Sequence, residues 1–304
     1  MIKKKICLVT GGAGFIGSNL ANELAKNNKV IIIDNLATGH YRNIKHIEKK
    51  ITFLKQDIAK ITNSLTKIKK IDYVFHLAAF TSVQESLKKP KKYFKNNIDN
   101  TLLLIQELKR YKIKKFVYIA SASCYGNNNN ILTEESPIKC LSPYAKSKWI
   151  AEQLSKKSCI NLNIPFISMR LFNAYGPNSD LSSEYVGVIG KFIYNKLNRQ
   201  PLNIFGSGKQ TRSFVHVDDV VKALILAAKS QYKNETYNVA GKTSVSINKI
   251  ASFFKSKVIY KKERKSEVKI SRSSLKKIKK ELNYNISVNF SSGLKKLIQY
   301  YENK

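Results

Sequence analysis

The first half of the chain alternates short, almost wholly apolar runs with longer segments in which apolar residues recur at helical spacing. Runs such as Val30-Ile31-Ile32-Ile33 suit the strands of a parallel sheet that is covered on both faces. The alternation predicts an α/β protein with a doubly wound parallel sheet. The expected strands are Ile6–Thr10, Val30–Asp34, Ile51–Lys55, Tyr73–Leu77, Lys115–Ala120 and Phe166–Leu171, and the expected helices are Ile16–Lys26, Lys92–Tyr111 and Pro143–Lys157.

From about Asn173 onward the pattern becomes irregular. Turn-forming residues divide this part into short pieces, at Pro177, Pro201 and Gly206-Ser207-Gly208. One further helix is predicted over Asp218–Lys229, with Asp218 or Asp219 capping its start. The pattern therefore indicates a smaller C-terminal lobe.

A chain of 304 residues can form one large or two modest domains. We expect a sheet domain in residues 1–172 and a smaller lobe in residues 173–304, interleaved so that roughly residues 214–240 return to the first domain. No run approaches the roughly 18 apolar residues needed to span a bilayer, and the apolar stretch after Lys3-Lys4-Lys5 is too short for a signal peptide. The four cysteines lack CxxC spacing, which indicates a cytoplasmic protein with reduced thiols and no metal site.

The charge balance is unusual, with 55 Lys and Arg against 20 Asp and Glu and a net charge of +35. Such a balance could indicate a nucleic-acid or membrane-surface partner. The basic residues are dispersed along the chain, however, and no recognised nucleic-acid module or aromatic–basic interleaving is present. We therefore favour lysines spread over solvated faces, which could also draw in a substrate that carries a pyrophosphate.

A glycine-rich turn, Thr10-Gly11-Gly12-Ala13-Gly14-Phe15-Ile16-Gly17, joins the first predicted strand to the first predicted helix. Such a turn cradles a dinucleotide pyrophosphate: Gly11 allows the tight turn, Gly14 the approach of the backbone to the phosphates, and Gly17 close packing of helix and strand. Asp34 ends the next predicted strand, where its carboxylate would accept hydrogen bonds from the adenosine ribose and repel a 2′-phosphate. The sequence therefore predicts NAD as the cofactor, in preference to NADP.

Tyr144 and Lys148 are four residues apart, so on one helix their side chains lie on the same face. A free tyrosine titrates near 10, so a tyrosine base at neutral pH needs its pKa lowered by about three units, or roughly 4 kcal/mol. The ammonium of Lys148 and a cationic nicotinamide would both favour the phenolate. The pair therefore indicates an enzyme that moves a proton and a hydride together.

With these motifs the chain resembles, nearly end to end, the extended short-chain dehydrogenase/reductase superfamily, and specifically its NAD-dependent nucleotide-sugar epimerase/dehydratase family. The resemblance implies a Rossmann-type sheet and assigns Ser121, in Ser121-Ala122-Ser123-Cys124-Tyr125-Gly126, as the catalytic hydroxyl beside Tyr144 and Lys148. The implied cofactor-binding residues are Gly11, Gly14, Phe15, Ile16, Gly17, Asp34, Asn35, Asp57, Ile58, Leu77, Ala78, Ala79, Asn97, Tyr144 and Lys148.

The same resemblance implies that the smaller lobe holds a nucleotide sugar. Asn173 matches an asparagine that contacts the pyrophosphate, Val188 lies in a stretch that closes over uracil, and Arg212 and Arg264 match phosphate-binding arginines. The small Ser271 favours N-acetylhexosamine substrates. The implied substrate-binding residues are Ser123, Asn173, Val188, Arg212, Arg264 and Ser271.

Ala122 and Ser123 occupy positions where the dehydratase branch usually carries an Asp-Glu pair, which argues against a 4,6-dehydratase. The resemblance therefore favours NAD-dependent 4-epimerisation of a UDP-sugar, of the UDP-glucose or UDP-N-acetylglucosamine type, through a transient 4-keto sugar. The alternatives are a UDP-glucuronate decarboxylase or a reductase/epimerase of the same fold, or a non-catalytic RNA-binding descendant. The resemblance also implies a homodimer, paired through the helices that contain Asn97 and Tyr144.

Overall fold

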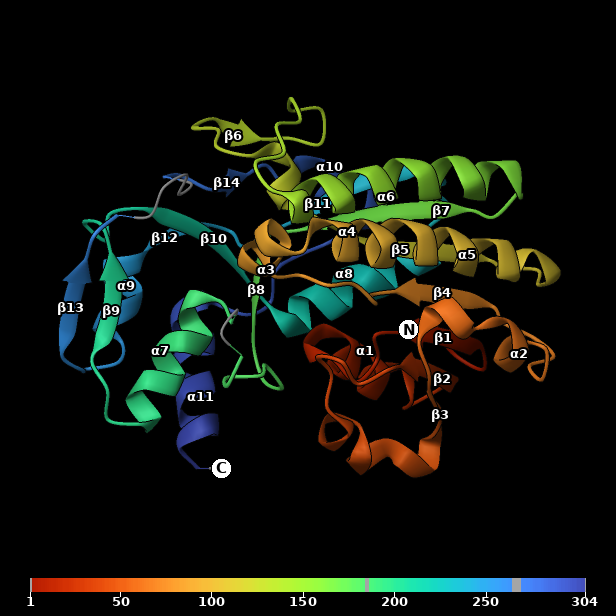
Figure 1. Cartoon of the computed structure of the whole chain (residues 1–304), viewed down its shortest axis with the longest axis horizontal. Coiled ribbons are helices and arrows are strands. Elements are labelled where there is room, and N and C mark those ends of the chain that lie inside the picture. The colour runs from red at the N-terminus through yellow and green to blue at the C-terminus, as the bar shows by residue number, and fades with distance from the viewer. Residues whose placement is uncertain (1, 184–185, 264–268, 304) are drawn as a thin grey trace.

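The computed structural model describes residues 2–183, 186–263 and 269–303. Within them, seven parallel strands form a central sheet in the order β3-β2-β1-β4-β5-β7-β11 (Figure 1). The chain runs outward from β1 in both directions, so the strand order reverses between β1 and β4. The strands are β1 Ile6–Thr10, β2 Lys29–Asp34, β3 Ile51–Lys55, β4 Tyr73–His76, β5 Lys115–Ser121, β7 Phe166–Leu171 and β11 Glu235–Val239.

The predicted doubly wound Rossmann-type sheet is confirmed, and each of the six expected strands agrees with the structure to within one residue at either end. The seventh strand, β11, was not expected. Its sequence, Glu-Thr-Tyr-Asn-Val, mixes polar and apolar residues, and it lies at the sheet edge beside β7. An edge strand has a neighbouring strand on one side only, so some of its residues stay partly exposed and can be polar.

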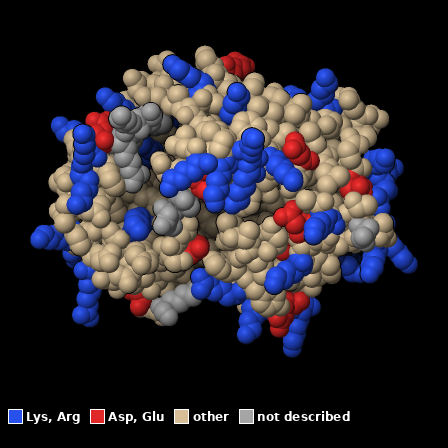
Figure 2. Space-filling model, in the orientation of Figure 1, with Lys and Arg blue, Asp and Glu red and all other residues tan. Residues whose placement is uncertain are grey.

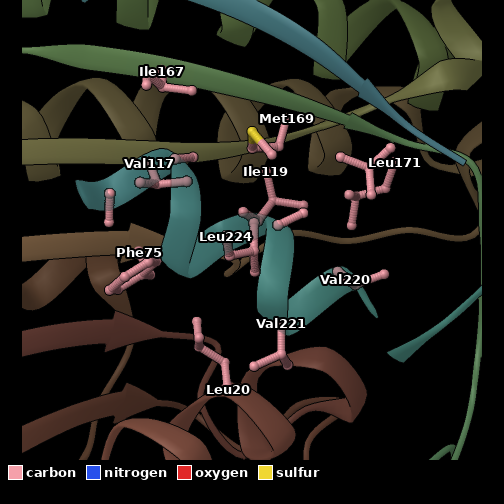
Figure 3. Packing of buried hydrophobic residues seen from close by; sticks show 14 of the residues in the cluster. Leu20, Phe75, Val117, Ile119, Ile167, Met169, Leu171, Val220, Val221 and Leu224 are labelled. Carbon is pink, nitrogen blue, oxygen red and sulfur yellow. The ribbon is translucent and has the colours of Figure 1, made fainter. Parts of the chain in front are cut away.

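The sheet is buried on both faces because alternate strand residues enter different apolar clusters. In β5, Phe116 and Tyr118 pack on one face, while Val117 and Ile119 pack on the other. The first face is covered by α2 Thr62–Leu65, α5 Asn100–Glu107 and α6 Pro143–Asn161, and the second by α1 Phe15–Leu24, α8 Val217–Lys229 and α10 Lys276–Leu282. Figure 3 shows the α8 side chains between the strand residues and Leu20 of α1.

The helix expected over Lys92–Tyr111 is built from several pieces. It consists of α4 Pro90–Phe94, a π-helical turn Lys95–Asp99, α5 and a 3-10 turn Leu108–Arg110. A π-turn inserts an extra residue into the helical repeat, and such turns are frequent at functional sites. A further short helix, α3 Val83–Lys88, precedes α4.

The prediction that Asp218 or Asp219 caps α8 was wrong. The N-cap is His216, whose Nδ1 accepts a hydrogen bond from the amide of Asp218 at 3.2 Å. Asp219 is buried and accepts hydrogen bonds from the amides of Ser287 and Val288 and from the Ser287 hydroxyl. Its carboxylate therefore ties α8 to the segment that leads into the last helix.

The smaller lobe lies on the left of Figure 1, at the carboxyl side of the sheet. A third apolar cluster forms its core and contains aromatic residues such as Phe192 and Phe254, whose rings meet edge to face. Its elements are β8 Asn173–Tyr175, β9 Leu202–Phe205, β10 Thr211–His216, β12 Ser244–Ser246, β13 Val258–Lys261, α7 Val188–Leu197, α9 Ile247–Ser252 and α11 Phe290–Glu302, with β6 Ile131–Leu132 pairing β14 Arg272–Ser273 nearby. Among the described residues, no helix combines the length and apolarity that a membrane span needs.

We expect Leu224→Ala to lower the free energy of unfolding by about 2–5 kcal/mol, because this fully buried side chain of α8 would leave a cavity under the sheet. Leu197→Ala removes the same atoms from a side chain that is 43% exposed, and should cost about 0.5 kcal/mol or less. Urea denaturation at equal cofactor content would compare the two. Equal losses would contradict the proposed packing of α8.

Candidate active site

The glycine turn after β1 is shaped by contacts that only glycine permits. Gly11 has φ +69°, and a Cβ there would lie 2.7 Å from the amide nitrogen of Ala78. A Cβ on Gly17 would lie 2.1 Å from the carbonyl oxygen of Gly11. Gly14 is the N-cap of α1 and offers no side chain to the first amides of the helix. The free amide groups at the start of α1 carry the partial positive charge of the helix N-terminus, so they can bind the phosphates of a dinucleotide.

Asp34 ends β2 beside this turn and is 8% exposed. Its two carboxylate oxygens accept hydrogen bonds from the amides of Ala13 at 2.9 Å and Leu36 at 2.8 Å, which fix its orientation. Asn35 donates to the carboxylate of Asp57 at 2.7 Å, so the ends of β2 and β3 are joined. Each carboxylate oxygen of Asp34 keeps acceptor capacity for the hydroxyls of a ribose.

The segment after β4 is held by a chain of hydrogen bonds through His76. Thr101 donates its hydroxyl proton to the carbonyl of Asn97, so His76 Nε2, 2.8 Å from the Thr101 oxygen, must carry a proton. His76 Nδ1 then accepts from Thr10, whose oxygen also accepts from the amide of Ala78. Burial, and next the charge of Lys148, lower the pKa of His76 to about 3, so the ring is neutral. This chain places Ala78 against the glycine turn.

Ser121 and Tyr144 meet at the carboxyl end of β5. Ser121 caps the 3-10 turn Ala122–Tyr125 by accepting from the amide of Ser123, and its Oγ lies 2.9 Å from the Ser123 Oγ. Tyr144 lies in the first turn of α6, which Ser142 caps through the amide of Ala145. Burial raises the pKa of Tyr144, and a side-chain hydrogen bond with Ser121 opposes that rise.

Lys148 is 5% exposed and lies one helical turn beyond Tyr144. Its Nζ lies 4.4 Å from the centre of the Tyr118 ring, a cation–π geometry. Burial lowers the pKa of Lys148 to about 7, against the opposing charge of Glu152. Burial thus acts against the ammonium of Lys148, and the carboxylate of Glu152 acts in its favour.

Asn97 lies in the π-helical turn and is 1% exposed. Its amide nitrogen donates to the Phe80 carbonyl and the Ser147 hydroxyl, both at 3.0 Å. Its oxygen accepts from the amide of Phe80 and the side chain of Asn96. All four hydrogen-bonding positions of the amide are thus used within the protein. The structure places Asn97 where it fixes α6 against the segment after β4.

The expected substrate-binding residues lie on several elements of the lobe. Asn173 begins β8 and donates to the carbonyl of Ser213, while Val188 begins α7 and is half-buried. Arg212 lies on β10, and Ser271 is 8% exposed and pairs its amide with the Thr211 carbonyl. Arg264 lies outside the described residues.

A separate cavity of about 840 Å³ lies in the lobe between β10, β12 and the start of α11. Its walls include Phe214, Lys242, Lys249 and Ser291, and it contains none of the expected catalytic or substrate-binding residues. The described residues hold no cluster of three or more His, Cys, Asp or Glu that could bind a metal ion.

A Rossmann-type sheet with this glycine turn, and with Ser121 at the end of β5 near Tyr144 and Lys148 of α6, is the arrangement expected of an NAD-dependent enzyme. The sequence profile of the NAD dependent epimerase/dehydratase family matches residues 7–240, and the chain belongs to this family. It is 35% identical to a putative UDP-glucose 4-epimerase of Methanocaldococcus jannaschii, covering 97% of this chain and 98% of the relative. The family uses NAD, as the residues of the cradle predict.

Two further comparisons define the range of reactions among its relatives. A UDP-N-acetyl-alpha-D-glucosaminuronate decarboxylase of Bacillus cytotoxicus is 30% identical, with 98% of each chain covered. The solved structure of UDP-N-acetylglucosamine 4-epimerase from Methanobrevibacter ruminantium, in complex with UDP-N-acetylmuramic acid, superposes with a TM-score of 0.93 at 34% identity, covering 99% of each chain. The family of nucleotide-sugar epimerases and dehydratases is therefore established for this chain, and its relatives include both 4-epimerases and a decarboxylase.

Sequence reasoning missed two buried charged residues next to the site. Glu152, 1% exposed, lies four residues beyond Lys148 on α6 and forms an ion pair with Arg170 of β7. The four-residue spacing of Tyr144, Lys148 and Glu152 was a visible signal, because all three must share one helix face. An arginine inside a mostly apolar strand was a second signal, since buried charges need partners.

Gly11→Ala should weaken NAD binding by at least about tenfold, because alanine is strained at positive φ and its Cβ would overlap the Ala78 backbone. The NAD released from purified, denatured protein measures the effect. Gly187→Ala is the matched control, because a Cβ there meets nothing within 4 Å. A folded Gly11→Ala protein with wild-type NAD content would contradict this account of the cradle.

Proposed function

We propose that this chain catalyses the NAD-dependent 4-epimerisation of a UDP-sugar, of the UDP-glucose or UDP-N-acetylglucosamine type. The observation that carries the proposal is that α6, which bears Tyr144 and Lys148 one helical turn apart, packs against the end of β5 where Ser121 lies. The 4-epimerases among its relatives, one of them at 35% identity, support the same assignment.

The glycine turn, Asp34 and the Ala78 segment would hold the cofactor. NAD, when bound there, would accept a hydride from the sugar C4 and return it. Tyr144 would take the proton from the C4 hydroxyl and later give it back, and Ser121 would orient that hydroxyl and stabilise the charge that develops on it. Because burial raises the pKa of Tyr144, the phenolate needs nearby positive charge, which Lys148 can supply only as the ammonium.

Epimerisation fits the turn after Ser121 better than dehydration does. Water loss needs an acid and a base beside the sugar, and here the two positions after Ser121 are Ala122 and Ser123. The hydroxyl of Ser123, 2.9 Å from that of Ser121, can hydrogen-bond to a sugar but cannot serve as the missing carboxylate. Decarboxylation of a UDP-glucuronate stays the second candidate, because a decarboxylase is among the relatives at 30% identity.

The high positive charge fits an anionic substrate. Lys and Arg side chains are scattered over the visible face of the molecule and outnumber Asp and Glu there, and several of them stand beside the hollow in its middle (Figure 2). A field of this sign would raise the local concentration of a pyrophosphate and speed its association, more strongly at low salt. Because Ser121, Tyr144 and Lys148 are all present, we favour this role over RNA binding.

We further propose that two copies associate through α5 and α6. Leu103 of α5 and Leu154 of α6 are 36% and 37% exposed, and the two helices pack against each other. Apolar side chains on neighbouring helices offer a surface that a second copy can cover symmetrically.

Incubation of the protein with UDP-glucose, UDP-N-acetylglucosamine and UDP-glucuronate, followed by NMR of the sugar protons, should show inversion at C4 in at least one of them. Tyr144→Phe should lower kcat by about 10²–10⁴-fold and leave bound NAD in place, because it removes only the hydroxyl that moves the proton. Tyr260→Phe removes a phenol that is 59% exposed and should leave kcat unchanged. Carbon dioxide release without C4 inversion would instead assign a decarboxylase, and no turnover of any of the three would refute the proposed reaction.

Leu103→Glu combined with Leu154→Glu should convert a dimer into a monomer, because it places charges in the apolar centre of the proposed contact. Light scattering coupled to gel filtration measures the mass of each species. Leu197→Glu, on an exposed side chain of α7, is the control and should leave the mass unchanged. A wild-type protein that is monomeric at micromolar concentration would disprove the proposed dimer.

A further inference from the structure

One face of α6 carries a tyrosine, a lysine and a carboxylate at successive helical turns. Tyr144 reaches Ser121, Lys148 lies over the Tyr118 ring, and Glu152 lies one turn further along, 1% exposed. Burying three ionisable groups in a row is costly unless each charge has a partner. The buried ammonium of Lys148 therefore needs a nearby negative charge or dipole to offset the loss of its hydration.

Glu152, one helical turn beyond Lys148 on the same face of α6, is the carboxylate whose charge acts on the lysine. From β4, His76 is neutral, with a pKa lowered to about 3 by burial and by Lys148 itself. From β5, Tyr118 is buried and its pKa is raised well above the usual value, so it presents a neutral ring and hydroxyl. Tyr144, on α6 itself, also has a raised pKa. Glu152 is the group that counteracts the effect of burial on the lysine.

Arg170 fixes the carboxylate of Glu152. Its Nε donates to both carboxylate oxygens, at 3.1 and 3.0 Å, and its Nη2 lies 3.0 Å from one of them. Thr236 of β11 adds a hydrogen bond at 3.3 Å. A carboxylate that is held by several hydrogen bonds from a guanidinium cannot change rotamer freely.

The same arginine reaches the catalytic turn. Its Nη1 donates to the Tyr125 hydroxyl at 2.9 Å and to the carbonyl of Glu134 at 3.1 Å. Tyr125 ends the 3-10 turn that begins after Ser121, and its hydroxyl donates to Asn238 of β11 at 2.7 Å. One guanidinium thus joins the element that carries the tyrosine and lysine to the element that carries the serines.

We propose that Glu152 and Arg170 are a positioning pair for the proton-transfer group: Glu152 holds Lys148 as the ammonium, and Arg170 keeps the serine turn and α6 in register. The inference rests on the proposed roles of Tyr144 and Lys148. Neither member of the pair has to touch the sugar or the cofactor, and the pair acts through Lys148 and Tyr125.

The test follows the titration of Lys148 directly. In NAD-bound protein labelled with [ε-¹³C]lysine, the Lys148 resonance is the one that Lys148→Arg removes. Glu152→Gln keeps the shape of the side chain and removes its charge, so the Lys148 midpoint should fall by about one pH unit or more. Glu152→Asp retains the charge and should titrate close to the wild type. Glu23→Gln, which removes a helix carboxylate paired with the exposed Lys26 at 2.6 Å, should leave the midpoint unchanged.

Because Glu152→Gln leaves Arg170 buried without its partner, the double variant Glu152→Gln/Arg170→Met separates charge from stability. We expect the double variant to melt closer to the wild type than the single one does, with the Lys148 midpoint still lowered. With a turned-over sugar, the alkaline limb of the kcat profile should move to lower pH in both variants. An unchanged Lys148 midpoint in the folded double variant would overturn the proposal. A shifted midpoint in a protein that turns over no nucleotide sugar would refute the proposed function and leave the pair intact.

Discussion

The burial of one positive charge, that of Lys148, is the constraint on which the rest of the site depends. An ammonium that is enclosed by a helix and a sheet loses its hydration, and burial accordingly lowers its pKa to about 7. Its surroundings compensate in different ways: the face of Tyr118 attracts the cation, a neutral His76 avoids repelling it, and Glu152 supplies the opposite charge. Because water is excluded, the charge of Lys148 acts more strongly on the neighbouring hydroxyl of Tyr144 than it would in solvent.

The topology of the sheet explains why these groups meet. The carboxyl ends of β1, β4 and β5 lie side by side, so the glycine turn, the segment after His76 and the turn after Ser121 open on one edge. The π-turn at Asn97 then sets the position of α6 relative to this edge. By using all four positions of its amide on Phe80, Asn96 and Ser147, Asn97 fixes α6, and with it Tyr144, relative to that edge.

The strands of the sheet could be predicted from the sequence because each inner strand is a short run of apolar residues buried on both faces, and such a run is visible without knowledge of the rest of the chain. The prediction of the α8 cap failed at Asp219, whose hydrogen bonds involve residues that are far away in the sequence. The N-cap of α8 is His216, while Asp219 accepts hydrogen bonds from Ser287 and Val288, 68 and 69 residues away. The π-turn at Asn97 likewise needs contacts that only the assembled fold supplies. Helix spacing and a charge within a strand hinted at Glu152 and Arg170, but their pairing with each other becomes visible only in the fold. The glycine turn was predictable because its spacing is itself the structural requirement.

An epimerase has a requirement that an ordinary dehydrogenase lacks: it must restore its own starting state in each cycle, with the proton and the hydride both returned. In the proposed reaction, Tyr144 could give back the proton it takes only if its pKa lay near that of the group it serves, so neither the phenol nor the phenolate could be strongly favoured. Burial favours the phenol, whereas Lys148 favours the phenolate. Loss of the ammonium of Lys148 would shift this balance toward the phenol. In the positioning pair that we propose, the buried carboxylate of Glu152, held by Arg170, favours the charged lysine and so maintains the balance.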